Sequence, residues 1–191
     1  MHDARMKVAT ALQLQTQKLL QQVGMPNALF EVAVREMVSK KLNENGYSEV
    51  EYLFSANKGF APQPIRKVAS GGELSRLLLC IKSQQADAGK LPTLIFDEID
   101  AGISGEVALK VGEIMQRMAR SHQLICITHL PQIASTAQQH FYIYKETKLG
   151  KTTTRVRLLE GETRVTEIAK MLGGDKVSQA ALANARELLG E

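Results

Sequence analysis

Residues 69–76 read Ala69-Ser70-Gly71-Gly72-Glu73-Leu74-Ser75-Arg76, and from residue 72 to about residue 86 leucine and isoleucine recur at helical spacing. The glycines therefore stand at the start of a predicted helix. They let a ligand approach the backbone closely, and the first amides of a helix have no partners within it. Together with the helix dipole, these amides suit a phosphate group. Taken alone, a plain capped turn would explain the same residues equally well.

A short apolar run, Leu94-Ile95-Phe96, ends in the paired acids Asp97 and Glu98. This pattern predicts a buried parallel strand that carries carboxylates to its C-terminal edge. Adjacent strand residues point to opposite sides, so the two acids can have different roles. One carboxylate can hold Mg²⁺, usually through water, and the other can polarise an attacking water. The plain alternative is a solvent-exposed strand end with two acids.

A second strand pattern, residues 124–127, ends in Thr128-His129, and a helical pattern over residues 105–120 separates the two strands. The order strand, helix, strand predicts a right-handed parallel crossover. We therefore expect Asp97, Glu98 and His129 at the same edge of one sheet. At that edge His129 can reach a γ phosphate, although a histidine after a strand is more often a structural residue.

The chain contains no Gly-x-x-x-x-Gly-Lys-Ser/Thr loop to hold β and γ phosphates. The nearest candidate is Gly150-Lys151-Thr152, but Lys145 occupies the position where the loop needs its first glycine. The flanking residues, 141–144 and 153–158, read as two strands around a turn, so we expect Gly150 to be a hairpin glycine. The sequence therefore looks like half of an ATPase.

The N-terminal segment, residues 3–23, lacks glycine and proline and has Val8, Leu12, Leu19 and Val23 at helical intervals. It is either an ordinary surface helix or the end of a coiled coil, because two or three heptads do not decide between them. Further patterns predict strands over residues 28–34 and 50–55 and helices over residues 165–172 and 177–189.

Composition limits the class of protein. With 191 residues, 44% of them hydrophobic, the chain can bury a substantial core. It has neither an apolar run of about 18 residues nor a signal-like leader, so a cytoplasmic protein without a membrane span is expected. The formal charge of +4 permits contact with nucleic acid but locates no site. The isolated Cys80 and Cys126 are expected to be buried thiols.

Three segments, residues 68–76, 96–105 and 128–134, resemble motifs of ABC-type ATPase heads, and more narrowly those of SMC-like ATPases of bacterial DNA repair. The resemblance covers nearly the whole chain. It implies an α/β fold, namely the C-terminal lobe of a P-loop NTPase ABC-type head with a parallel sheet flanked by helices. Residues 1–24 would be the end of a returning coiled-coil helix, and residues 25–191 would be the lobe itself.

In such heads ATP lies between two head domains, so the resemblance implies ATP and Mg²⁺ as cofactors. Residues 100–104 would cross the head–head interface. Ser104 stands where many ABC proteins have an aspartate, and it is left out of the catalytic set. The implied roles are nucleotide contact for Ser70, Gly71, Gly72, Glu73 and Asp97, metal binding for Asp97, water activation for Glu98, and γ-phosphate sensing for His129.

The resemblance implies three partners: an N-terminal lobe of the same protein that supplies the phosphate loop, a second head domain, and DNA. The complete protein would hydrolyse ATP at the head–head interface to drive recombinational repair of double-strand breaks, in the cytoplasm and in association with the nucleoid. This chain alone would be inactive, because it lacks the phosphate loop. The alternatives are the ATPase subunit of an ABC membrane transporter, which shares all three motifs, and a structural module without enzymatic activity.

Overall fold

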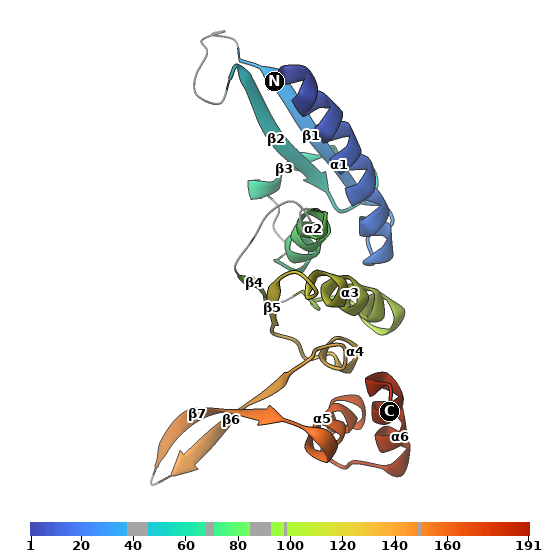
Figure 1. Cartoon of the computed structure of the whole chain (residues 1–191), viewed down its shortest axis with the longest axis vertical. Helices are drawn as coiled ribbons and strands as arrows, with labels where there is room; N and C mark the ends of the chain where they lie inside the picture. Colours follow the sequence, from blue (N-terminus) through green and yellow to red (C-terminus); the bar gives the residue numbers. More distant parts are fainter. Residues whose placement is uncertain (38–45, 68–70, 85–92, 98, 149) are drawn as a thin grey trace. The chain divides into compact units, whose positions relative to one another are not determined.

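The computed structural model describes residues 1–37, 46–67, 71–84, 93–97, 99–148 and 150–191. These residues form two compact units, Met1–Ile127 and Thr128–Glu191. Figure 1 shows the elements of each unit along the chain. The sequence resemblance instead divides the chain into a coiled-coil helix end, residues 1–24, and a head lobe, residues 25–191. That division stays a prediction.

The fold is α/β, as expected. Short elements that the sequence did not predict are β3, the 3₁₀ helix η1 and α4. In the first unit the elements are α1 (His2–Gln22), β1 (Leu29–Glu36), β2 (Ser48–Ser55), β3 (Gln63–Pro64), η1 (Ile65–Lys67), α2 (Gly71–Ser83), β4 (Thr93–Phe96), α3 (Gly105–Met118) and β5 (Gln123–Cys126). In the second unit they are α4 (Pro131–Ala134), β6 (His140–Lys148), β7 (Lys151–Leu159), α5 (Gly161–Gly173) and α6 (Gln179–Leu189).

Helix α1 lies along β1, the edge strand of an antiparallel sheet with the order β1-β2-β3 (Figure 1). Two glutamines of α1 bind the backbone of this segment. Gln17 donates its amide N–H to the carbonyl oxygen of Ala28 and accepts from the Phe30 amide at 3.1 Å. Gln13 accepts from the Val32 amide at 3.3 Å. These side chains satisfy backbone groups that an edge strand would otherwise leave without protein partners.

Helix α1 buries only some of the apolar residues near its inner side. Ala9, Thr16 and Leu20 are buried, and so is Val23 just after the helix, whereas Val8 is 66% exposed. Thr16 is also held by the residue that follows α2, since the Gln84 side chain donates to its hydroxyl at 2.7 Å. The helix thus packs largely through polar and small side chains.

Strands β4 and β5 are parallel, with Thr93 opposite Gln123 and Phe96 opposite Cys126, and α3 forms the crossover between them. The parallel crossover is confirmed. The expectation that β4 is buried is correct for only one face, since Phe96 is buried but Ile95 is 66% exposed. Two further isoleucines on the exposed face are Ile125 at 45% and Ile127 at 51%.

The core of the first unit lies among α1, α2 and α3, which contact one another. Helix α3 buries Val111, Ile114, Met115 and Met118, as its periodicity predicts. On α2 the buried apolar residues are Leu77, Leu79, Cys80 and Ile81. Within the part of the chain that the structure describes, no helix has the length and apolar content needed to cross a bilayer.

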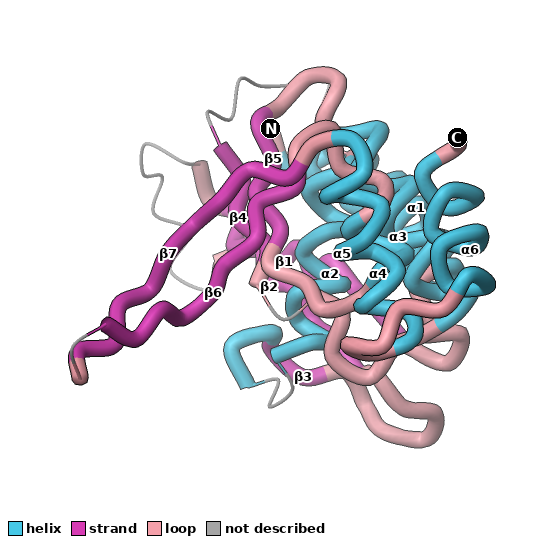
Figure 2. The backbone as a smooth tube through the Cα atoms, turned by 90° about the horizontal axis from the view of Figure 1, so that it is seen from below, coloured by secondary structure: helices cyan, strands magenta, loops and turns pink. Residues whose placement is uncertain are grey.

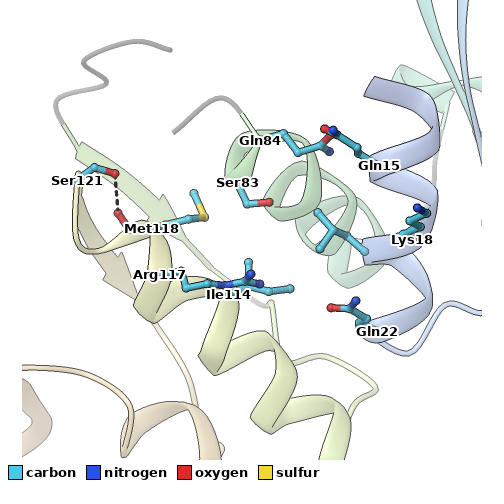
Figure 3. Close-up of a pocket in the computed structure, with 10 residues that line it drawn as sticks. Gln15, Lys18, Gln22, Ser83, Gln84, Ile114, Arg117, Met118 and Ser121 are labelled. Atoms are coloured by element: carbon cyan, nitrogen blue, oxygen red, sulfur yellow. Dashed lines mark hydrogen bonds between the residues drawn. The ribbon is translucent and has the colours of Figure 1, made fainter. Parts of the chain in front are cut away.

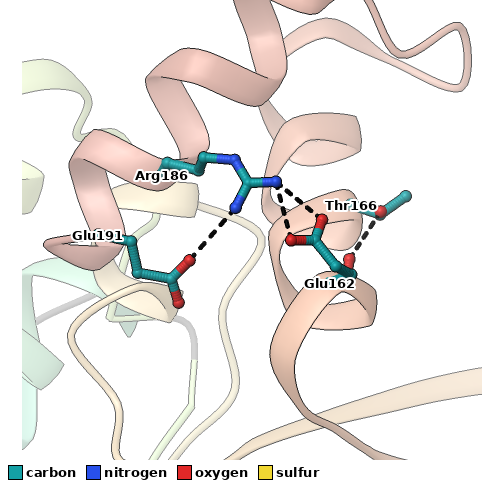
Figure 4. Close-up of polar contacts among 4 residues, drawn as sticks. All are labelled: Glu162, Thr166, Arg186 and Glu191. Atoms are coloured by element: carbon teal, nitrogen blue, oxygen red, sulfur yellow. Dashed lines mark hydrogen bonds and ion pairs between the residues drawn. The ribbon is translucent and has the colours of Figure 1, made fainter.

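In the second unit, β6 and β7 form a long two-stranded ribbon (Figure 2). Gly150 at its turn has a φ of +76°, which confirms the hairpin glycine and removes it from any phosphate loop. Helices α5 and α6 pack through small and apolar side chains, including Val165, Ile168 and Ala185. Arg186 joins the two helices by donating to both carboxylate oxygens of Glu162 at 2.8 and 2.9 Å (Figure 4).

Candidate nucleotide site

Helix α2 begins at Gly71, where the sequence predicts phosphate-binding amides. Gly72 is buried, and Glu73 lies half-buried in the first turn. The amides of this turn have no helical acceptor, and the helix dipole adds partial positive charge there. Ser70 lies outside the described residues. The start of α2 therefore has the backbone chemistry that an anionic phosphate needs.

Asp97 follows β4 directly, and its side chain is exposed. Ser75 of α2 donates its hydroxyl to the backbone oxygen of Asp97 at 3.2 Å. The contact brings the first turns of α2 to the end of β4, although 22 residues separate the two positions in the sequence. Glu98, the expected water-activating acid, lies outside the described residues.

Arg76 makes a second contact between α2 and the loop that follows β4. Its Nη1 donates to the backbone oxygen of Ala101 at 2.7 Å, and the residue is only 6% exposed. Burial lowers the pKa of the Arg76 guanidinium, and the opposing effects of Glu73 and Cys80 are smaller. Helix α2 thus holds the loop at Asp97 and again four residues later.

The cysteine at the end of β5, Cys126, is affected by two acids of this loop. The pKa of the Cys126 thiol is raised to about 12, mainly by burial and further by Asp100 and Asp97. Cys80 also has a pKa of about 12, because it is buried in α2. Both cysteines are free thiols, Cys80 fully and Cys126 partly buried, and both stay protonated near neutral pH.

His129 lies at the start of the second unit, three residues after the end of β5. Between them, the Ile127 amide donates to the Phe96 oxygen at 2.9 Å. Its side chain is exposed. The turn that carries it is closed by Thr128, whose hydroxyl accepts from the Leu130 amide at 3.0 Å. The expected position of His129 at the edge that bears Asp97 stays a prediction, as does its role.

Asp97 and the start of α2 fit the cofactors that the sequence predicts. Mg²⁺ prefers oxygen ligands and usually keeps several waters, so one exposed carboxylate beside substrate phosphates is enough protein ligand for it. The described segments contain no cluster of three or more His, Cys, Asp or Glu side chains that could hold a metal. ATP fits the helix start, where amides and not side chains would meet its phosphates.

Sequence reasoning missed Ser75 and Arg76 as parts of the site, although both belong to the stretch that defines it. A signal was present for Arg76. It follows Gly72 by four residues and precedes Cys80 by four, so all three lie on one face of α2, and that face is buried. A charged residue on a buried face requires a specific partner.

A polar pocket of about 470 Å³ lies elsewhere in the first unit, between α1, α2 and α3 (Figure 3). It is lined at the end of α2 by Ser83 and Gln84, on α1 by Lys18 and on α3 by Arg117. The candidate site lies at the start of α2, so this pocket is separate from it.

Known proteins resemble this chain over nearly its whole length. It is 40% identical over 189 residues to the DNA repair protein RecN of Vibrio cholerae. The aligned region covers 99% of this chain and 34% of the relative. It is also 44% identical over 149 residues to RecN of Bacillus subtilis, and that aligned region covers 78% of this chain and 26% of the relative. The chain thus spans about one third of the length of these curated relatives. No protein-family model matches it.

Solved structures with a similar fold are heads of SMC proteins. The Smc head domain with a coiled coil and joint from Pyrococcus yayanosii matches 86% of this chain and 30% of that chain, with a TM-score of 0.59 and 20% identity. A chain studied for ATP-driven dimerization and DNA stimulated activation of SMC ATPases matches 90% of this chain and 98% of that chain, with a TM-score of 0.52 and 17% identity. At these identities the likeness shows the fold alone.

Proposed function

We propose that this homologue of the RecN DNA repair proteins, with the fold of an SMC head, is the C-terminal lobe of an ATPase head that serves double-strand break repair. The observation that supports this most directly is the contact of α2 with the loop after β4. Ser75 and Arg76 hold the acid-bearing loop beside the glycines at the start of α2. That arrangement suits two groups that act on one phosphate chain.

In the proposed reaction the chain contributes binding, orientation and water activation. The amides at Gly71 and Gly72, with Ser70, bind the γ phosphate of a nucleotide held by the partner head, and Glu73 shapes the same turn. Glu98 orients a water molecule and accepts its proton. Asp97 holds Mg²⁺ through its carboxylate, and the ion supplies neutralisation of phosphate charge when bound.

His129 completes the proposed set as a sensor of the γ phosphate. An imidazole can donate a hydrogen bond to a phosphate oxygen when the ring nitrogen that faces it is protonated. The short turn closed by Thr128 and Leu130 keeps His129 at an exposed position close after β5. His129 would bind only while the γ phosphate is present, which makes it suited to distinguish ATP from ADP.

The proposed partner within the same protein is an N-terminal lobe that carries the phosphate loop. Among the described residues, β4 and β5 form a sheet of two strands whose face with Ile95, Ile125 and Ile127 is exposed. Strands with two apolar faces are typical of parallel sheets that are covered on both sides. A lobe that covers this face would bury the isoleucines and bring the phosphate loop to the strand edge that carries Asp97.

Helix α1 is proposed as the end of the returning coiled-coil arm. Val8, Leu12 and Leu19 form a stripe beside the buried face, and Val8 is 66% exposed. A stripe in which Val8 is exposed and Leu12 and Leu19 are only half-buried suits a second helix packed at coiled-coil spacing. Closing of two heads on ATP and their opening after hydrolysis would then move this arm, and DNA is the partner on which that motion acts.

The test is Glu98→Gln in the complete protein that contains this chain, with Glu106→Gln in the first turn of α3 as a matched control. Loss of the water-activating group is expected to lower ATP turnover by about 10²- to 10⁴-fold. Head dimerisation on ATP should persist, because the amide leaves phosphate binding intact. Unchanged turnover in Glu98→Gln would reject the assigned chemistry, and loss of turnover in Glu106→Gln would show that the effect is not specific.

The alternative, an ATPase subunit of a membrane transporter, predicts a surface that docks a membrane permease. No observation on the described residues favours it, and the relatives from Vibrio cholerae and Bacillus subtilis are DNA repair proteins. The two functions differ in their partner. Stimulation of ATP turnover by DNA supports the repair role, whereas turnover that responds only to a co-purified membrane protein supports the alternative.

A further inference from the structure

Arg76 occupies a position where an apolar side chain would stabilise the helix more simply. It is 6% exposed, and its α2 neighbours Leu77, Leu79 and Cys80 are fully buried. Its Nη1 binds one backbone oxygen, and its Nε has no hydrogen-bond partner among the described residues. A buried cation that is incompletely paired is costly compared with a well-packed apolar residue. Stability alone therefore does not explain the arginine.

The oxygen that Arg76 binds belongs to a tight turn. The Asp100 oxygen accepts from the Ile103 amide at 3.3 Å, and Gly102 has a φ of +73°. In such a turn the carbonyl of the second residue, here Ala101, points away from the turn's own hydrogen bond and needs an outside donor. Arg76 supplies that donor at 2.7 Å and so fixes where the loop turns.

The neighbouring Ser75 holds the other end of the same loop through the backbone oxygen of Asp97 at 3.2 Å. Two successive residues of α2 thus bind the loop at two points four residues apart. A hydroxyl and a guanidinium reach the backbone of this loop, so neither contact engages the exposed carboxylate of Asp97. Both contacts begin within two turns of Gly71, where α2 starts.

We infer that Arg76 is a positioning residue for ATP turnover: it fixes the acid-bearing loop to the start of α2, so that the phosphate-binding glycines and the acids move as one body. This inference rests on the proposed function. It adds that the backbone at Asp97 and at Ala101 is held to α2 before any nucleotide or second lobe arrives. A misplaced acid would leave nucleotide affinity nearly unchanged and slow the chemical step.

The first measurement is hydrogen exchange on this chain alone. Arg76→Met keeps the volume and the buried contacts of the side chain but removes the donor, and the protein should remain folded. Amide exchange over residues 99–104 is expected to become at least tenfold faster, because local opening no longer breaks the bond to Ala101. The control is Arg117→Met on α3. The Arg117 residue is exposed and its side chain has no hydrogen bond or ion pair among the described residues, so this variant should leave the exchange unchanged.

The second measurement is ATP turnover of the complete protein. Arg76→Met is expected to lower kcat about 10- to 100-fold while the KM for ATP changes less than about threefold. Arg76→Lys, which restores one donor, should recover part of the loss. Melting temperatures of all variants show whether a merely structural defect accounts for the change.

The outcomes separate the inference from the function on which it rests. Faster exchange with lower kcat supports the inference. Unchanged exchange, or faster exchange with full turnover, overturns it. A wild-type protein without ATP turnover overturns the proposed function and the catalytic part of the inference together, and the exchange experiment then decides by itself whether Arg76 holds the loop.

Discussion

Helix α3 buries most of its apolar residues within the chain, whereas helix α1 leaves several apolar side chains exposed. On α3, Val111 and Ile114 are 0% and 1% exposed. On α1, Val8 is 66% exposed, while the adjacent face buries Ala9 and Thr16. The difference teaches that α3 is packed mainly inside this unit, whereas the exposed apolar residues of α1 suit its proposed role as a coiled-coil arm.

The two faces of the β4–β5 sheet also differ in how far their apolar residues are buried. Phe96 lies on the covered face, and Ile95 and Ile125 lie on the exposed one. Single exposed apolar residues are normal on protein surfaces, but several on one sheet face indicate an interaction surface. The covered regions therefore determine whether the chain folds, and the exposed ones bear on assembly with the rest of the proposed head.

The largest expected effect on stability comes from the covered side of this contrast. Ile114→Ala in α3 should lower the free energy of unfolding by about 2–5 kcal/mol, because it leaves a cavity in a packed core. Val8→Ala in α1 should change it by less than about 0.5 kcal/mol. Urea denaturation of this chain measures both. Similar losses in the two variants would contradict the distinction between the helices.

A smaller effect is expected where α1 packs through polar groups. Gln17→Ala removes an amide that binds both the Ala28 oxygen and the Phe30 amide, so a loss of about 1–3 kcal/mol is expected. Gln21→Ala, on the exposed face of the same helix, is the control and should be nearly neutral. Chemical denaturation of both variants decides the matter, and equal stabilities would mean that the glutamine contacts contribute nothing.

Polar substitution on the exposed sheet face should leave the chain stable but weaken its assembly. The double change of Ile95 and Ile125 to threonine keeps two β-branched residues, so stability should change by about 0.5 kcal/mol or less per site. Binding of the phosphate-loop lobe should weaken at least tenfold, since apolar area is lost from the interface. Val50→Thr on β2 is the control. Undiminished binding of the double variant in calorimetry would place the lobe elsewhere.

A separate effect concerns pH. The folded chain raises the pKa of Cys80 and Cys126 from 9.0 to about 12. The folded state therefore keeps protons that the unfolded state loses, and the stability of the wild type falls as the pH rises from about 9 toward 12. Replacing both cysteines by alanine removes this contribution. Thermal melting at pH 8 and pH 10.5 should show a smaller pH-dependent decrease in the variant than in the wild type.

The sequence predicted the long elements well because their periodicity reflects contacts inside the chain. The crossover from β4 through α3 to β5 and the hairpin at Gly150 follow from patterns of local spacing and turn chemistry. The burial of α1 and β4 could not be read in the same way. The sequence pattern around an apolar residue such as Val8 or Ile95 is the same whether that residue packs within this chain or against another segment.

The candidate site was predicted in its outline but not in its connections. The glycines of α2 and Asp97 lie in elements joined by Ser75 and Arg76. The spacing on α2 shows that Arg76 needs a buried partner, but it does not show which one, and the contact of Ser75 joins residues that are distant in sequence. Roles for Gly71, Asp97 and His129 remain predictions. Ser70 and Glu98 lie outside the described residues, so their places also remain predictions.

The most direct test of the central claim is ATP turnover measured with this chain alone, with the phosphate-loop lobe of the same protein alone, and with the two mixed. If the start of α2 and the acids after β4 form half of a nucleotide site, only the mixture should hydrolyse ATP, and Glu98→Gln in this chain should abolish that activity. Turnover by this chain alone at the rate of the mixture, or an inactive mixture of two folded and associated lobes, would contradict the account.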